Sequence, residues 1–195
     1  MSKSEGQSAK KEQKNNFNWV ITVFLVTILI SGTISLVSDE IMAASTMWVA
    51  FLILLLIVLI GIVFDIIGVA VTSADEKPFH SMAARKVPGA TEALRLLRKA
   101  ERVSSICNDV IGDICGVVSG AASATIAVQL LDNFTFSWPR LASLLMSAFV
   151  AGLTVGGKAL GKSFAIKSRT EIVFAVGRVI HGFHCVGNIF SKKKS

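Results

Sequence analysis

Four long runs of apolar residues alternate with polar segments along the chain. They occupy residues 17–37, 47–71, 107–131 and 138–155. An α-helix needs roughly 17–25 mostly apolar residues to cross a bilayer, and all four runs fall in this range. The pattern therefore predicts an all-α integral membrane protein with four transmembrane helices.

The first run resembles a signal peptide, but its apolar core is long and no small-residue cleavage site follows it. We therefore predict a retained helix over residues 17–37. The polar residues 1–16 before it predict a disordered cytoplasmic tail. Residues 47–190 are then expected to form one membrane domain, and residues 191–195 a basic tail.

Two further segments have the pattern of helices that lie along a membrane surface. Residues 90–103 place Ala93, Leu94, Leu97 and Ala100 at helical spacing, with basic residues elsewhere. Such a pattern predicts an amphipathic interfacial helix. Residues 170–190 are apolar but contain charged positions, which predicts a second interfacial helix. Residues 157–168 are predicted to be a basic linker.

Composition and charge support a membrane protein. The chain is 52% hydrophobic and 17% charged, with a net charge of +7 and a mean hydropathy of +0.64. The basic residues flank apolar runs, so a membrane surface explains them better than nucleic acid. All 20 Lys and Arg except Arg140 lie in the N-terminal tail, residues 72–104 or the C-terminal segment. The distribution predicts a multi-pass cell-membrane protein with both termini cytoplasmic.

The third run carries polar and small residues on one side of a predicted helix. At roughly 100° per residue, one stripe holds Asp109, Gly112, Asp113, Gly116, Gly120 and Ser123. Glycines four residues apart let another helix approach closely. A carboxylate in a bilayer costs about 2.5–3.5 kcal/mol and usually faces a bundle interior. The stripe predicts close packing around a polar pocket, with solvated interfacial aspartates as the alternative.

The fourth run and the residue directly after it also have small residues at intervals of four or five positions. Ser143 and Ser147 are followed by Gly152 and Gly156, which are predicted to face the third span. Gly112, Gly116 and Gly120 also offer a close-packing face for a homodimer, with packing inside one chain as the alternative use of that face.

The order of motifs from residue 47 onward resembles the transmembrane domain of the CorB/CorC and cyclin M (CNNM) family of magnesium transporters. Residues 70–75 resemble the end of that family's Ser-Glu-Thr-Ala-Leu region. Residues 90–102 resemble its surface helix, and Asn108-Asp109-Val110-Ile111 resembles its Gly-Asn-x-Leu-Val-Asn opening. Residues 157–163 and 169–183 resemble its closing segment. The resemblance implies magnesium transport, a dimer, and Asn108 as an ion ligand.

The chain also departs from the family pattern. Ile67 and Gly68 stand where the family has Ser and Glu, Gly161 replaces a proline, and Lys158 replaces an acidic residue. The nucleotide-binding CBS domains have no counterpart in this sequence. The membrane architecture is therefore expected to carry over more safely than the transport activity.

Oxygen-bearing side chains in the spans suggest a site for a hard cation. Mg²⁺ prefers six oxygens, often including waters and one or two carboxylates. The candidate ligands are Asp65, Asn108, Asp109, Asp113 and Ser123. Alternatives are that Asn108 caps the start of the third span and that Asp65 pairs with Lys77 or Arg85.

Other chemistry has weaker support. Cys107 and Cys115 are interpreted as buried small hydrophobes, without a disulfide or zinc site. His181, His184 and Cys185 could hold a soft metal, but two histidines without a further clear ligand are more often interfacial residues. The sequence has no nucleophile triad or phosphate-binding loop in a usable context, so an enzyme is not expected.

We therefore expect a divalent cation transporter, with magnesium as the ion, the lipid bilayer as surroundings and a second copy as partner. The alternative is a non-transporting scaffold or regulatory subunit with the same fold. A third interpretation, an export or lysis pore, rests only on small size and a basic tail.

Overall fold

The structure, a computed structural model, describes residues 21–38, 40–41, 45–133 and 139–192. These residues are almost entirely helical, and they contain no β-strand. Four of the described helices are long and apolar enough to cross a membrane: Ile21–Ser38, Met47–Ser73, Ala100–Leu131 and Ser143–Lys167. The predicted all-α membrane protein is confirmed at this level.

The first two apolar runs form helices close to their predicted bounds. The N-terminal helix is described over Ile21–Ser38, and the predicted tail, residues 1–16, lies outside the described residues. Helix α2 covers Met47–Ser73 and ends where Ala74 becomes extended. A helix satisfies its own backbone hydrogen bonds, which is what an apolar segment needs in lipid.

The polar segment after α2 folds into two short helices. Helix α3 covers Lys77–Ala84 and has Pro78 in its first turn, where proline is well tolerated. Helix α4 covers Ala90–Leu97, and Gly89 before it has a φ of 89°. A positive φ is cheap only for glycine, so Gly89 allows the sharp reversal between α3 and α4.

The predicted surface helix over residues 90–103 is wrong as a single element. It breaks after Leu97, and the chain resumes as α5, Ala100–Ser105. Helix α5 continues through a π-helix, η1 (Ile106–Gly112), into α6, Asp113–Asn133. The third candidate span therefore begins before residue 107, because the polar turn at residues 100–105 extends the same helical rod.

The basic linker predicted over residues 157–168 is also wrong. Helix α7 runs without interruption over Pro139–Lys167, and α8 follows over Arg169–Lys192. Helix α7 continues because Gly157 and Gly161 face α2, where they pack against Ile62 and Ile66. Packing against a neighbouring helix outweighs the low helix propensity of glycine here.

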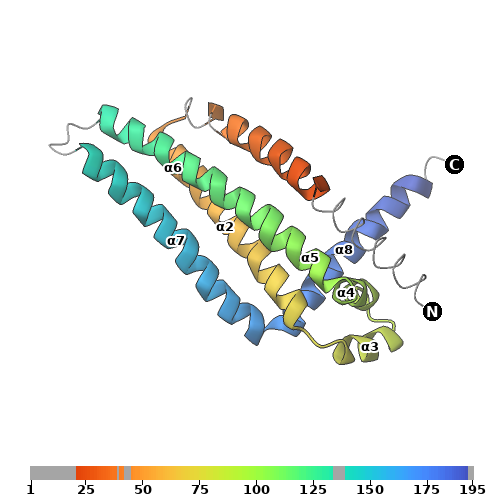
Figure 1. The fold of residues 1–195 in the computed structure, drawn as a ribbon. Helices are drawn as coiled ribbons and strands as arrows, with labels where there is room; N and C mark the ends of the chain where they lie inside the picture. Colours follow the sequence, from red (N-terminus) through yellow and green to blue (C-terminus); the bar gives the residue numbers. More distant parts are fainter. Residues whose placement is uncertain (1–20, 39, 42–44, 134–138, 193–195) are drawn as a thin grey trace, which may run out of the picture.

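Helix α2 lies at the centre of the bundle, between α6 and α7 (Figure 1). Three apolar clusters hold the bundle together. One joins the C-terminal end of α2 to α3, α4, α7 and α8, and it includes Phe79, Leu94 and Val173. A second lies among α2, α6 and α7 around Leu54 and Ile126. The third lies on η1 and α6, where residues of the N-terminal helix and α2 pack against it.

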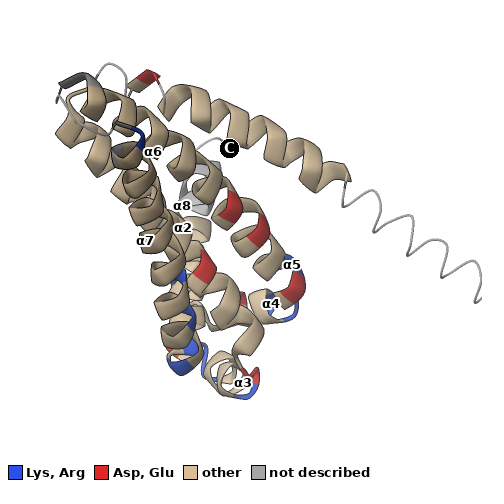
Figure 2. Cartoon of the chain, turned by 60° about the vertical axis from the view of Figure 1, so that its left-hand side comes forward, with Lys and Arg blue, Asp and Glu red and all other residues tan. Residues whose placement is uncertain are grey.

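The charges separate from the apolar shaft of the bundle. Most of the Lys and Arg shown lie at the end formed by α3, α4, α5 and the C-terminal part of α7 (Figure 2). The candidate spans expose many large apolar side chains, among them Leu52, Leu144 and Phe149. This arrangement suits a bundle surrounded by lipid, with one strongly basic end.

Candidate functional site

The contact between α2 and η1–α6 is built from alternating small and larger residues. At each of three levels a glycine on one helix faces a side chain of the other. The pairs are Gly61 with Cys115, Gly112 with Asp65, and Gly68 with Asn108. A Cβ at any of these glycines would collide with the facing side chain. The two helices therefore approach closely enough to bury polar groups between them.

Asp65 lies buried in this contact and forms an ion pair with α7. Its side chain is 7% exposed, and its Oδ2 lies 3.1 Å from the Lys158 Nζ. Lys158 also donates a hydrogen bond to the Gly112 carbonyl oxygen, at 3.3 Å. One ammonium group therefore joins α2, η1 and α7. The predicted pairing of Asp65 with Lys77 or Arg85 is wrong, because the α7 helix brings Lys158 to it instead.

Asn108 occupies the next level of the same contact. Its amide nitrogen donates to the Ser104 Oγ at 3.1 Å, while its Oδ1 is buried and has no hydrogen-bond partner among the described residues. A buried oxygen without a partner is costly and points to a missing donor or cation. Asn108 lies within η1 rather than at a helix start, so the predicted capping role is wrong.

The other predicted ion ligands lie elsewhere. Asp109 and Asp113 are exposed. Ser123 is buried farther along α6 and donates its hydroxyl hydrogen to the Gly120 carbonyl at 2.7 Å. The five predicted ligands therefore do not meet in one place. The described part of the chain has no group of three or more His, Cys, Asp or Glu that could hold a metal ion.

The π-helical turn explains why the residues of the predicted polar stripe on the third span do not all face the same way. The prediction used 3.6 residues per turn, but η1 makes wider turns with i→i+5 bonds, which shifts the facing of the residues around it. Gly112 is buried, whereas Asp109 and Asp113 on either side of it are exposed. The sequence has no simple signal for a π-helix, although such turns often occur at functional sites.

The glycines predicted to pack closely divide in the same way. Gly112 meets Asp65, but Gly116, Gly120, Gly152 and Gly156 would have nothing within 4 Å of an added Cβ. The prediction that Gly152 and Gly156 pack closely on the third span is therefore not met within the chain. Instead, a cavity of about 390 Å³ lies between α6 and α7, lined by Gly, Ser, Ala, Thr and Val residues and by Lys158.

Helices α4 and α8 are joined by a second polar contact, outside the candidate spans. The His181 Nδ1 lies 3.2 Å from the Glu92 Oε1, and the Cys185 Sγ lies 3.6 Å from the His181 Nε2. The hydrogen bond from His181 holds the pKa of Glu92 below its usual 4.5, against the raising effect of burial. His181, expected as a possible soft-metal ligand, is therefore engaged with a carboxylate that sequence reasoning did not pair with it.

Comparisons with known proteins return no family. No protein-family model matches the chain, and no curated protein or solved structure matches it either. The resemblance to magnesium transporters therefore stays a prediction from the quoted motifs.

Proposed function

We propose that this chain is a multi-pass cell-membrane protein that transports a divalent cation, with Mg²⁺ as the first candidate. The supporting observation is a buried carboxylate, Asp65, within a candidate span. The unpartnered Oδ1 of Asn108 lies in the same helix contact, against Gly68, which follows Asp65 by three residues on α2. Ionisable residues inside membrane spans are costly and commonly mark ion pathways. Both termini on the cytoplasmic side would place the basic end inside, in line with the positive-inside rule.

The oxygens at this site can bind a hard cation only after the Lys158 side chain moves away from them. Asp65 offers a carboxylate, Asn108 an amide oxygen and Gly112 a backbone carbonyl, and waters would have to complete six-fold coordination. Lys158 already contacts Asp65 and Gly112. A divalent ion and the Lys158 ammonium therefore compete for the same oxygens, and ion entry requires Lys158 to move away.

This competition gives a sharp test in purified protein titrated with MgCl₂ by calorimetry. Asp65→Asn and Asn108→Ala should weaken Mg²⁺ binding by at least roughly 10-fold, because both remove direct ligands. Lys158→Met should strengthen it, since the competing charge is gone. Asp109→Asn is the matched control, because Asp109 is the neighbour of Asn108 but is exposed. Flux into proteoliposomes should follow the same order.

A non-transporting scaffold or regulatory subunit is the second candidate. It is favoured by the same ion pair, because Lys158 neutralises Asp65 without any added ion and ties three helices together. In that case neither the parent nor Lys158→Met binds Mg²⁺, and Asp65→Asn lowers only stability. The Lys158→Met titration therefore separates the two functions.

A homodimer remains part of the proposal. The open glycines of α6 and α7, together with the small side chains around the 390 Å³ cavity, leave room for a helix of a second copy. Mass measurement in mild detergent should then give twice the chain mass, and Gly120→Leu should shift it to the monomer. A monomeric parent protein would exclude this assembly.

A further inference from the structure

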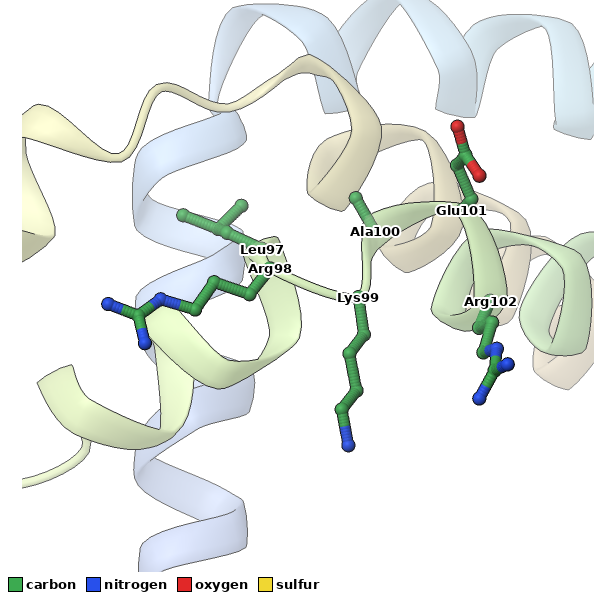
Figure 3. A pocket seen from close by; sticks show the side chains of 6 residues that line it. All are labelled: Leu97, Arg98, Lys99, Ala100, Glu101 and Arg102. Carbon is green, nitrogen blue, oxygen red and sulfur yellow. The ribbon is translucent and has the colours of Figure 1, made fainter. Parts of the chain in front are cut away.

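The bend between α4 and α5 contains a cavity that the proposed ion site does not use. The cavity measures about 490 Å³ and is lined by Leu97, Arg98, Lys99, Ala100, Glu101 and Arg102 (Figure 3). This volume lies within the usual range for small-ligand sites, about 300–1,000 Å³. Since α5 opens the candidate span Ala100–Leu131, the cavity lies where a short polar helix turns into a membrane-crossing rod.

The open side of this cavity is strongly basic. Figure 3 shows the Lys99 and Arg102 side chains extending to the same side of the bend, Arg98 extending sideways from its other end, and Glu101 pointing to the opposite side. Arg98 and Lys99 are exposed, and among the described residues neither forms an ion pair with an acidic side chain. Two cationic side chains are therefore available, with Arg102 adding to the positive field.

The chemistry of these groups matches a phosphate. One guanidinium group can donate two parallel hydrogen bonds to two phosphate oxygens, and a lysine ammonium group adds a compact charge on a flexible side chain. The location of the cavity beside a candidate span indicates that this phosphate belongs to a lipid. One turn beyond Arg102 on the same rod, Ile106 is 41% exposed and offers an apolar surface to an acyl chain. Basic residues next to a span attract anionic lipids.

We propose that the α4–α5 bend binds the phosphate-bearing headgroup of an anionic phospholipid, with Arg98 and Lys99 as its direct ligands. Leu97 and Ala100 form the wall of the site on the protein side. This site is independent of the proposed ion transport, because it shares no residue with the Asp65 contact.

The test uses the full chain in detergent micelles and a fluorescent phosphatidylglycerol, with phosphatidylcholine as the zwitterionic comparison. The double variant Arg98→Gln/Lys99→Gln should weaken phosphatidylglycerol binding roughly 30-fold, from the usual contribution of two cations near an anionic lipid. The matched control is Arg85→Gln/Lys162→Gln, which removes one exposed arginine and one exposed lysine elsewhere at the basic end. It should change binding less than roughly 3-fold.

Two further experiments test whether the loss of binding is specific to this site. The charge-keeping variant Arg98→Lys/Lys99→Arg should retain most of the binding, and circular dichroism should show that all variants keep their helix content. Equal losses in the two glutamine doubles would overturn the proposal, because binding would then follow total charge alone. Displacement of the lipid by inorganic phosphate alone would also overturn it, since the ligand would then be a soluble anion.

Discussion

The α2–η1 contact and the α6–α7 contact both carry rows of small residues, yet they differ in what faces those residues. Between α2 and η1, each glycine receives a side chain from the other helix, and the polar groups of Asp65 and Asn108 are buried there. Between α6 and α7, the glycines face open space and a cavity. Small residues therefore permit close packing, but a complementary side chain on the opposite helix is needed to achieve it.

The largest loss of stability is expected from removing a charge at the α2–η1 contact. Asp65→Ala leaves the Lys158 ammonium without its carboxylate between three helices. Removing one partner of a buried pair usually costs about 3–5 kcal/mol, and the partial exposure of Lys158 places the expected loss near 3 kcal/mol. Unfolding of the protein in detergent measures this loss.

The double variant Asp65→Ala/Lys158→Met provides the control. It should be more stable than Asp65→Ala alone, because no unpaired charge remains. A double variant that loses the sum of both single effects would show that the pair does not couple the helices.

A smaller loss is expected from filling a glycine in the same contact. Gly68→Ala places a methyl group against the Asn108 side chain. Overpacking of this kind costs about 1–3 kcal/mol. Thermal unfolding in detergent should detect it, and Asn108→Ala in the same background should restore part of the stability by making room.

The polar contact between α4 and α8 should contribute less. Glu92→Gln weakens the hydrogen bond from His181, at an expected cost of about 1 kcal/mol at neutral pH. The folded protein lowers the pKa of Glu92 below 4.5. The stabilisation is therefore fully present above pH 4.5 and is lost as the pH falls through the lowered value.

Unfolding curves of the parent and Glu92→Gln across this range provide the measurement. The difference in stability between them should shrink as the solution becomes more acidic. A difference that stays constant down to the lowest pH would mean that the Glu92 charge is not involved.

The smallest change in stability is expected at the α6–α7 contact, and it should be a gain. Gly120→Ala adds a methyl group where nothing lies within 4 Å and removes a helix-weakening glycine. The expected result is a gain of up to about 1 kcal/mol in the monomer. A loss comparable to that of Gly68→Ala, in protein shown to be monomeric, would remove the distinction between the two contacts.

The sequence alone determined the apolar helices and the basic end of the bundle. Hydropathy located α2 to within a few residues, because a span in lipid must be long, apolar and internally hydrogen-bonded. Hydropathy was less accurate in residues 157–168, where the segment is polar but helical. There the side chains suggested a linker, whereas contacts of Gly157 and Gly161 with α2 keep α7 helical.

Only the tertiary structure decided the partners. Lys158 is 93 positions from Asp65 in the sequence, and no local pattern links a residue of α7 to one of α2. The same holds for Glu92 and His181. The π-helical turn at η1 turned Asp109 and Asp113 away from the contact that Gly112 enters. Helical spacing predicts which residues share a face, but the path of the backbone and the neighbouring helix determine which face is buried.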